Sequence, residues 1–290
     1  MDNQQLNEKR KKTEQVIANV YNLPAISGMM MEISRLLDDP STNTQALSKI
    51  IGKDPGLTTK ILSISNSPLY GLPRKVSTID FAILIIGYQD IKNIVVALSM
   101  IESFKNKSDK NMKQEDFWKH SLIAGNAAKR ISEDLGYRFG GEAFVAGLLH
   151  DLGIPVIHKY FHSAFLEIIE RVEKENIPFL QAELEAMGMD HQEIGLLLSK
   201  KWNLPESLGE TVFNHHFPGK VIDNKELVAV VHLADYMTQK LQIGNFYWDS
   251  TIVLDDSIIQ TLKFRDSEHL DEFIESYRNL FTEEINNIRI

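Results

Sequence analysis

Histidine and acidic side chains interrupt two apolar segments of this sequence. His150 and Asp151 stand side by side in AFVAGLLHDLGIP, and Asp235 follows the apolar stretch VVHLA. Burying an ionised carboxylate costs several kcal/mol unless the group is paired or bound to a cation. The two interruptions therefore predict either a set of paired polar groups in the core or a site for a metal ion.

The distribution of the other histidines makes a metal site a reasonable hypothesis. Seven of the nine histidines lie between His120 and His216. Imidazole and carboxylate ligands suit zinc, manganese or iron, whereas calcium requires an oxygen cage. A metal held in this way lowers the pKa of a bound water, and phosphate esters are natural targets of the resulting hydroxide. The candidate ligands are His120, His150, Asp151, His191, His215, His216 and Asp235.

A hydrogen-bonded helical core is the alternative interpretation of the same residues. Isolated core histidines are common, so this interpretation is favoured for any one residue taken alone. For the whole set both interpretations stay open. His158, His162 and His269 look peripheral. His232 lies three residues before Asp235 on the same helix face, where it fits either support of a ligand or simple packing.

The composition is that of an acidic globular chain without cysteine. The chain has 290 residues, 43% of them hydrophobic, and 31 basic against 40 acidic residues give a formal charge of -9. This charge repels polyanions, so we expect no direct nucleic-acid binding. The basic run KRKK at 9–12 lies between Glu8 and Glu14, which favours charge pairing on a solvated helix. The lack of cysteine excludes disulfides, thiol nucleophiles and thiolate metal sites.

The chain carries no sign of export or membrane insertion. Its first twelve residues, MDNQQLNEKRKK, lack the apolar core of a signal peptide. No apolar run reaches the ~20 residues needed to cross a bilayer. We therefore expect a cytoplasmic protein that makes no membrane contact.

The hydrophobic periodicity predicts an all-α protein, a multi-helical bundle with an N-terminal helical subdomain packed on it. Asp54 and Pro55 are suited to start a helix, and Gly87, Gly136 and Gly153 are suited to end the helices that precede them. Ile91, Ile94, Val95 and Leu98 share one face of a further helix. Only FYWDSTIVL, at 246–254, is ambiguous between helix and strand.

A polar segment divides the chain into two expected parts. Residues 105–116, KNKSDKNMKQED, contain one apolar residue in twelve and cannot contribute much to a core. We expect an N-terminal helical subdomain at 1–108 and a second helical subdomain at 109–290. Near the C-terminus an apolar stripe follows a capping candidate, Ser267, and favours core packing over a partner surface. The stripe consists of Leu270, Phe273, Ile274, Tyr277, Phe281, Ile285 and Ile288.

Several segments of the chain form a specific combination of motifs. In the N-terminal part these are LPAI, IIGKDPGLTTKILSISNSPLYG and VSTIDFAILIIGYQDIKNIV. In the second part they are FWKHSLIAGNAAKRI, AFVAGLLHDLGIPV, HQEIGLLLSKKWNLPESLGETVFNHH and VHLADYM. Each fragment alone is weak, but together they are specific, and they resemble the HDOD family, a branch of the HD-domain superfamily of metal-dependent phosphohydrolases. The resemblance implies an HD-like helical bundle, with the HDOD core at about 20–220.

The resemblance also implies which residues hold the metal. The superfamily motif of a histidine, a His-Asp doublet and a final aspartate matches His120, His150, Asp151 and Asp235. The related HD-GYP phosphodiesterases use further histidines, which match His191, His215 and His216, and Asp116 is a looser match to an extra acidic ligand. The implied cofactor is one or two ions of iron, manganese or zinc. If two ions bind, Asp151 is the expected bridging ligand between them.

Two departures from the HD-GYP pattern bear on catalysis. Ile154 stands where the phosphate-binding lysine of those enzymes lies, and FPGK follows His215 and His216 in place of the HD-GYP signature. Without that lysine a phosphate loses a charge partner near the metal. The resemblance therefore supports the ligands more than the reaction.

We expect a bacterial signalling or regulatory HDOD protein that acts through protein partners, with an HD-type metal pocket and no assured catalysis. The alternative is a metal-dependent phosphohydrolase or phosphodiesterase that acts on a nucleotide or cyclic dinucleotide, so a nucleotide or phosphate ligand stays open. An inert helical scaffold with histidines only in its core is the third hypothesis.

Overall fold

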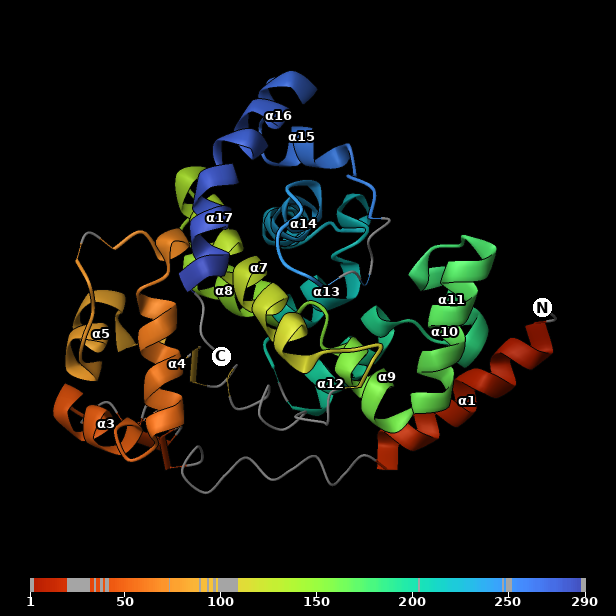
Figure 1. Cartoon of the computed structure of the whole chain (residues 1–290), viewed down its shortest axis with the longest axis horizontal. Helices are drawn as coiled ribbons and strands as arrows, with labels where there is room; N and C mark the ends of the chain where they lie inside the picture. Colours follow the sequence, from red (N-terminus) through yellow and green to blue (C-terminus); the bar gives the residue numbers. More distant parts are fainter. Residues whose placement is uncertain are drawn as a thin grey trace.

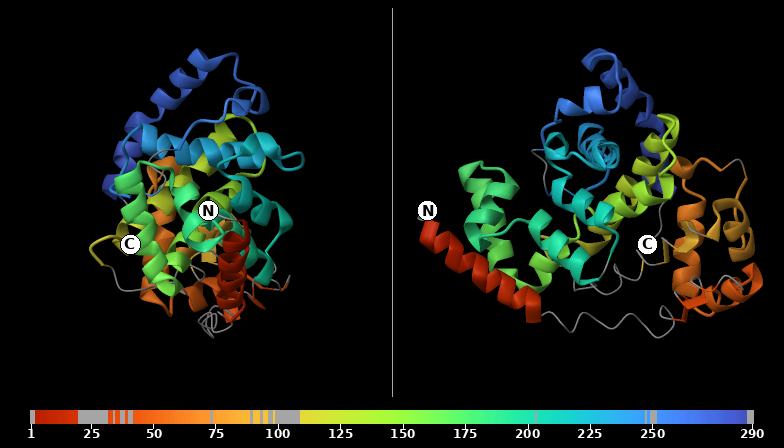
Figure 2. Two further views of the ribbon diagram at one scale, coloured as in Figure 1. Left: turned by 90° about the vertical axis from the view of Figure 1, so that its right-hand side faces the viewer. Right: turned by 180° about the vertical axis from the view of Figure 1, so that it is seen from behind.

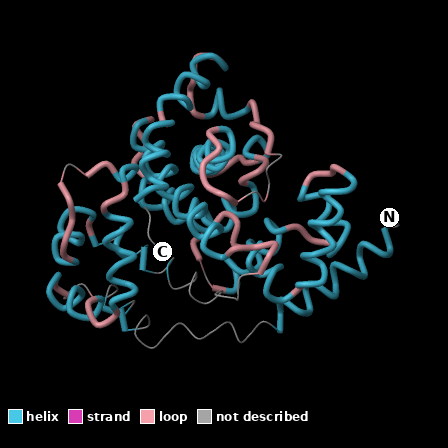
Figure 3. Tube along the Cα trace, viewed as in Figure 1, coloured by secondary structure: helices cyan, strands magenta, loops and turns pink. Residues whose placement is uncertain are grey.

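The computed structural model describes residues 3–19, most of 32–98, and 109–287 apart from 203, 247 and 249–251. These residues form helices joined by loops, and the described part of the chain contains no strand (Figure 3). The expected all-α class is confirmed. The described residues of the ambiguous segment 246–254 lie in loops and turns.

The helices of the described residues fall into three sets along the chain (Figure 1). The first set comprises α1 (Asn3–Asn19), α3 (Thr44–Ile51), α4 (Pro55–Ser65), the 3-10 helix η2 (Pro68–Tyr70) and α5 (Ile79–Ile86). The central set comprises α7 (Gln114–Asp134), α8 (Gly140–Leu149), α9 (Gly153–Tyr160), α10 (His162–Glu175), α11 (Phe179–Met187), α12 (His191–Lys201), α13 (Glu206–Asn214), η3 (Pro218–Lys220) and α14 (Lys225–Lys240). The last set comprises α15 (Ser257–Thr261), α16 (Ser267–Ser276) and α17 (Arg278–Asn287).

Helices α3, α4 and α5 form a small group at one end of the molecule (Figure 1). Helix α4 begins as its sequence predicts, because the Asp54 carboxylate accepts a hydrogen bond from the Leu57 backbone N–H and Pro55 occupies the first turn. Its apolar face is buried through Leu57, Ile61 and Ile64. The described residues of the following helical stretch bury the expected face, Ile91, Ile94, Val95 and Leu98.

Helices α7, α8 and α14 form the centre of the molecule. Helix α7 packs along α8 and against α14, while α12 packs on α13 and α10 on α11. The short α9 connects these groups, since it contacts both α12 and α10 (Figures 1 and 2). The ends of α8, α12, α13 and the middle of α7 and α14 thereby meet around one buried point.

The first helix lies far from its neighbours in sequence. Helix α1 packs on α11, on the opposite side of the molecule from α3–α5 (Figures 1 and 2). The hydroxyl of Thr13 donates to the Met187 carbonyl at 2.8 Å, and Lys9 donates to the Glu185 carbonyl at 2.6 Å. Arg10 pairs with Glu14 and, at 2.6 Å, with Glu193 on α12. The expected charge pairing of the basic run therefore includes a contact with the central helices.

The C-terminal stripe packs within the chain. It is divided between α16 and α17, and Leu270, Ile274, Tyr277 and Phe281 are buried. The N-cap of α16 is Asp266, whose side chain accepts from the His269 N–H, and the expected cap at Ser267 is wrong by one residue. Helix α17 rests on η2 and α7, so it joins the N-terminal helices to the central ones. Ile288 lies outside the described residues, and the division of the chain at 108 stays a prediction.

The segment that carries the His-Asp doublet differs from its expected form. Helix α8 ends at Leu149, and residues 150–152 form a turn before Gly153 starts α9. The expected helix end at Gly153 is wrong, since Gly153 begins α9, and within the turn the His150 ring bonds back to the Gly147 carbonyl. Gly153 serves another purpose: a Cβ atom there would lie 2.1 Å from the His191 carbonyl oxygen, so only glycine lets α9 approach α12 this closely.

The same region contains a long apolar run. Gly140–Tyr160, which comprises α8, the turn at 150–152 and α9, spans 21 residues and by length and composition alone is apolar enough to cross a membrane. The expectation that no apolar run reaches this length is therefore wrong. However, 89% of its most apolar window is buried inside the protein, which assigns the run to the core.

Candidate metal centre

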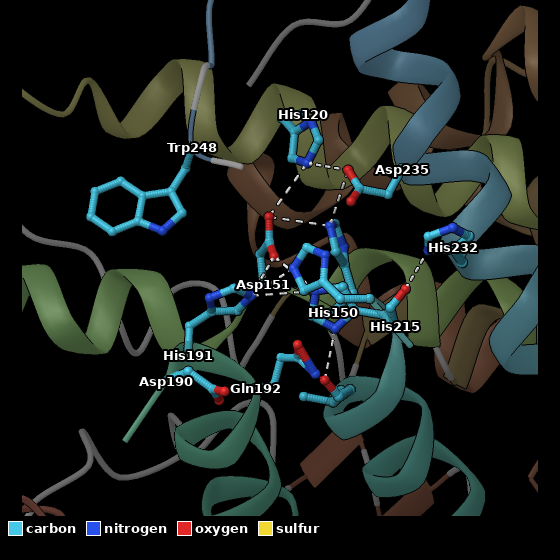
Figure 4. A network of polar contacts seen from close by, with 12 residues as sticks. His120, His150, Asp151, Asp190, His191, Gln192, His215, His232, Asp235 and Trp248 are labelled. Carbon is cyan, nitrogen blue, oxygen red and sulfur yellow. Dashed lines mark hydrogen bonds and ion pairs between the residues drawn. The ribbon is translucent and has the colours of Figure 1, made fainter. Parts of the chain in front are cut away.

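The structure brings the seven expected ligand residues together at one buried point, and Figure 4 labels all of them except His216. Each stands where a helix begins, ends or faces the centre, so that five separate parts of the chain contribute. They are His120 on α7, His150 and Asp151 in the turn between α8 and α9, His191 at the start of α12, His215 and His216 directly after α13, and Asp235 on α14.

One oxygen of Asp151 faces a first ligand group, defined as His120, His150 and Asp235. Asp151 Oδ2 lies 3.1 Å from His150 Nε2 and 3.5 Å from His120 Nε2. Asp235 Oδ1 lies 3.3 Å from His120 Nε2 and 3.6 Å from His150 Nε2. Two imidazole nitrogens and two carboxylate oxygens therefore surround one small volume, a donor set that suits a first-row divalent ion.

The other oxygen of Asp151 faces a second ligand group, defined as His191, His215 and His216. Asp151 Oδ1 lies 3.4 Å from His215 Nε2 and 3.6 Å from His191 Nε2. His216 Nε2 lies 3.2 Å from His191 Nε2. One donor atom from each of these four residues lies within 4.8 Å of the other three. The Asp151 carboxylate is thus placed between two ligand groups.

The histidine rings are oriented by the nitrogen that faces away from the centre. His150 Nδ1 lies 2.7 Å from the Gly147 carbonyl, and His215 Nδ1 lies 2.8 Å from the Val212 carbonyl. A carbonyl only accepts hydrogen bonds, so both Nδ1 atoms carry the proton. In the neutral rings the lone pair is then on Nε2, the atom that faces the other ligands. This is the tautomer that metal-binding histidines use when their Nδ1–H is held by an acceptor.

His191 shows the same arrangement with a carboxylate as the acceptor. Its Nδ1 lies 2.9 Å from Glu183 Oε2, and its Nε2 lies 3.4 Å from His215 Nε2. When both rings are neutral, the two Nε2 lone pairs point at each other and repel. A shared cation removes this repulsion, and a network of neutral core histidines does not.

The charges of the site support the same conclusion. Burial lowers the pKa of His215 and His216 to about 3, so both rings are neutral and able to bind a metal. Burial also lowers the pKa of His150, but Asp151 and Asp235 outweigh this effect and hold it well above its ordinary value. Protons on the first ligand group balance the two carboxylates when no metal ion does so.

The hydrogen bonding of the candidate ligand atoms also fits a metal ion. Among the described residues, His150 Nε2 and Asp151 Oδ1 are buried side-chain atoms that make no hydrogen bond of good geometry. Their polar contacts are with other candidate ligand atoms, Asp151 Oδ2 at 3.1 Å and His215 Nε2 at 3.4 Å. A metal ion on each side of Asp151 would satisfy both atoms. The residues present therefore fit two divalent first-row ions, with Asp151 as the shared ligand.

His232 belongs to the structural support of the site. Its Nδ1 donates to the His215 carbonyl at 2.7 Å, and its Nε2 accepts from the Asp255 N–H at 2.9 Å. Both ring nitrogens are used, so neither is open to a metal. From the sequence, His232 could either support a ligand or simply pack in the core. Its hydrogen bonds show that it supports the His215 backbone.

Two supporting residues were not identified from the sequence. Glu183 on α11 is fully buried and accepts hydrogen bonds from the His191 ring, the His191 N–H at 2.7 Å and the Trp248 indole N–H at 2.7 Å. An acidic residue within the apolar pattern of FLQAELEAM was the available signal for Glu183. Trp248 lies in the ambiguous segment 246–254 and carried no signal of this kind.

The centre is largely buried among the described residues. The seven candidate ligand residues are all buried, and the Phe246 ring lies against His120 with a centroid separation of 5.2 Å. Ile154, at the position of the absent lysine, is fully buried among apolar side chains. Asp116 is absent from the ligand groups found among the described residues. The geometry therefore suits metal binding better than direct entry of a large substrate.

The site thus lies in an all-helical bundle that brings a His-Asp doublet, further histidines and a last aspartate to one point that could hold a metal ion. Residues 23–218 match the HDOD domain family, and the chain belongs to this family. The match spans more than half of the chain and confirms the resemblance. It includes six of the seven ligand residues, while Asp235 lies beyond it.

Solved structures share the fold. An HDOD domain protein of unknown function from Geobacter sulfurreducens has a TM-score of 0.76 at 24% identity, covering 98% of this chain and 99% of that one. A protein from Shewanella amazonensis SB2B, named as a candidate phosphohydrolase, has a TM-score of 0.70 at 21% identity, covering 96% and 98%. At these identities the similarity establishes the fold alone.

One curated relative covers only part of a longer protein. An uncharacterized protein of Treponema pallidum (strain Nichols) is 23% identical over 218 residues, which is 74% of this chain and 42% of the relative. This chain therefore matches less than half of that protein's length.

Proposed function

We propose that this chain is a cytoplasmic regulatory module of a signalling pathway, built around a buried centre for two divalent metal ions, and that it acts through protein partners. The observation that carries the metal centre is the two-sided environment of Asp151. Each of its oxygens faces a separate group of ligands, and the Nδ1 atoms of His150, His191 and His215 are held so that Nε2 faces inward. Iron, manganese and zinc all suit these ligands.

The bound ions would supply positive charge at a point where five parts of the chain meet. His120 and Asp235 would fix the middle of α7 against α14, and His191 and His215 would fix the adjacent ends of α12 and α13. Asp151 would connect the two groups. Metal occupancy would thus control how firmly the central helices are held together.

Regulation fits the site better than catalysis. The centre is buried, Phe246 covers His120, and the apolar Ile154 offers no charge for a phosphate. The surface, by contrast, offers a place for protein contacts: Leu84 and Ile85 on α5 are exposed, Leu84 by 74%. Among the proteins of similar fold is one from Marinobacter aquaeolei VT8 that is named for signal transduction, with a TM-score of 0.70 at 15% identity.

Metal content tests the centre. Protein purified without a histidine tag or chelator should contain near-stoichiometric iron, manganese or zinc by elemental analysis, and His150→Gln should lose it. His269→Gln is the matched control, because His269 lies on α16 away from the ligand groups. Wild-type protein that is metal-free and takes up no added metal would contradict the proposal.

The partner role is tested on the full chain. Deleting residues 1–108 would remove η2 from its contact with α17 and expose core surface, so a single substitution is the more specific test. Leu84→Glu should abolish capture of protein partners from a lysate of the source cells. Val253→Glu changes another exposed apolar residue and should leave capture intact. Equal capture by both variants and the wild type would show that α5 is not the partner surface.

A second candidate function rests on the shared carboxylate. Two ligand groups on the two oxygens of Asp151 resemble a two-metal site, and such sites stabilise both the attacking and the leaving oxygen of a phosphate ester. The Shewanella amazonensis protein of similar fold is named for phosphohydrolase activity. In this case metal-loaded protein should hydrolyse a nucleotide or cyclic dinucleotide, and Asp151→Asn should not. No turnover with iron, manganese or zinc would exclude this function.

A further inference from the structure

Three side chains outside the central site form a second cluster of metal-binding type. Asp109 lies in the loop before α7, His158 lies in the last turn of α9, and His162 starts α10. Asp109 Oδ2 lies 3.0 Å from His158 Nε2 and 3.7 Å from His162 Nε2. The three donor atoms lie within 4.8 Å of one another. Two separate segments of the chain thus direct three ligand atoms at one point.

The carboxylate of Asp109 is held in position by its own loop. Its Oδ1 accepts hydrogen bonds from the backbone N–H groups of Asn111 at 2.8 Å and Met112 at 2.9 Å. This leaves Oδ2 directed at the two histidines. Ligand atoms about 2.0–2.1 Å from a tetrahedral zinc ion are roughly 3.3–3.5 Å apart. The two Oδ2 to Nε2 distances lie on either side of this value.

A simple hydrogen bond explains only part of the cluster. His158 is almost fully buried, and its bond to Asp109 is sufficient to pair those two groups. The side chain of His162 is 51% exposed, yet its Nε2 points at the same carboxylate oxygen. The ring of Phe165 lies against both histidines, with centroid separations of 4.8 and 6.2 Å, and forms an apolar wall. The exposed side of the cluster remains accessible to an ion and a water molecule.

We propose that Asp109, His158 and His162 form a peripheral site for one divalent transition-metal ion of the zinc type. Two neutral imidazoles and one carboxylate would be the protein ligands, and water would fill the fourth position. The ion would tie the loop at 109–112 to the junction of α9 and α10. The site is independent of the proposed central function, because it shares no ligand with the central groups.

The site has a structural consequence for the centre. Helix α7 follows the loop of Asp109 and carries His120. Helix α9 holds His158 in its last turn and begins directly after the turn that contains His150 and Asp151. A metal ion at the peripheral site would therefore hold together two elements that also position ligands of the central site.

Cobalt titration of the full chain tests the proposal, with tetrahedral Co²⁺ absorption and ion stoichiometry as readouts. Asp151→Asn serves as the background, so that binding at the centre is impaired. In this background one Co²⁺ ion per chain should bind with a tetrahedral visible band, and adding His162→Gln should abolish both. Adding His269→Gln, a histidine on α16 outside every ligand group, should change neither.

Two results would overturn the proposal. One is an unchanged band and stoichiometry when His162→Gln is added to the Asp151→Asn background. The other is the lack of any tetrahedral band in that background. Circular dichroism verifies that each variant is folded, and because the His162 side chain is half exposed its loss should leave the fold intact. Failure here would leave the elemental analysis of the central site unaffected.

Discussion

At the residue scale, the chemistry of the central site depends on atoms that never face a metal. The Nδ1 atoms of His150 and His215 donate to backbone carbonyls, and that of His191 donates to Glu183. Each bond fixes both a tautomer and a ring direction, which leaves Nε2 as the ligand atom. The backbone supplies two of these acceptors, so a side-chain substitution can remove only the Glu183 acceptor.

Glu183→Gln should weaken metal binding by ~10–100-fold, the usual effect of losing an outer hydrogen-bond partner of a ligand histidine. An amide cannot offer two acceptor oxygens to the His191 ring, the His191 N–H and the Trp248 indole together. Competition with a chelator measures the change. Glu185→Gln on the same helix is the control, since Glu185 pairs with Arg171. Equal affinities in the two variants would contradict the role of Glu183.

Metal binding near pH 7 should release protons. Asp151 and Asp235 hold the pKa of His150 well above its ordinary value of 6.5 despite the opposing effect of burial, so the metal-free ring is protonated at neutral pH. A metal ion requires the neutral ring, and the proton must leave. Calorimetric titration with Zn²⁺ in buffers of different ionisation enthalpy should therefore give different apparent heats. Identical heats in all buffers would mean that no proton is displaced.

At the element scale, close contacts between helix ends determine whether the ligands meet. Helix α9 begins against the first residue of α12, and α17 is joined to η2 and α7 by the buried Glu284. These contacts connect segments that are distant in sequence. The geometry of the site therefore depends also on residues whose side chains do not contact the candidate ligand atoms.

Gly153→Ala should destabilise the protein by about 3 kcal/mol, because the new Cβ would lie 2.1 Å from the His191 carbonyl oxygen and would push α12 away from α9. Urea unfolding measures the loss. The matched control is Gly209→Ala within α13, where a Cβ makes ordinary contacts at 3.4 and 3.5 Å and should be neutral or stabilising by up to about 1 kcal/mol. Similar stability of the two variants would contradict the close contact.

Glu284 should make stability fall as pH rises. Burial raises its pKa above the ordinary value of 4.5, although hydrogen bonds from Ser67, Leu69 and Asn126 partly oppose this. The folded state then holds the proton more tightly than the unfolded state, so the free energy of unfolding decreases from about pH 4.5 upward through the folded-state pKa. The loss is complete once the pH exceeds that folded-state value.

Glu284→Gln should remove this dependence, and its stability relative to the wild type should improve between pH 4.5 and pH 7. Asn126 Oδ1 makes no hydrogen bond among the described residues, so the Asn126 amide can turn to accept from the new amide. Urea unfolding at both pH values provides the measurement. Glu283→Gln, on the exposed face of α17, should show the wild-type trend. A relative stability that worsens toward pH 7 would contradict the sign.

At the scale of the whole molecule, a metal ion would act as a cross-link between distant segments. The ligands come from five parts of the chain, and an ion that binds only the folded state stabilises it by RT ln(1 + [L]/Kd), about 2.7 kcal/mol at a hundredfold excess over Kd. Removing metal with a chelator should lower the melting temperature of the wild type, and adding Zn²⁺ should restore it. Asp151→Asn should respond much less, and an equal response would contradict this account.

The sequence predicted the helices, and the seven candidate ligand residues it indicated lie together at one buried point, but their geometry could not be predicted. Local patterns sufficed for α4, where Asp54 and Pro55 start the helix. The end of α8 was placed too late because the bond from His150 to Gly147 depends on the turn itself. The two-sided position of Asp151 and the role of Glu183 arise from the packing of helices far apart in sequence, which periodicity does not encode.

Anomalous X-ray diffraction from crystals of tag-free protein grown without chelator would test directly whether Asp151 lies between two metal ions. We expect two peaks, one between Asp151 Oδ2 and the first ligand group and one between Asp151 Oδ1 and the second ligand group. No anomalous peak at either position after soaking with manganese or zinc would contradict this expectation. In that case the seven residues would form only a hydrogen-bonded core.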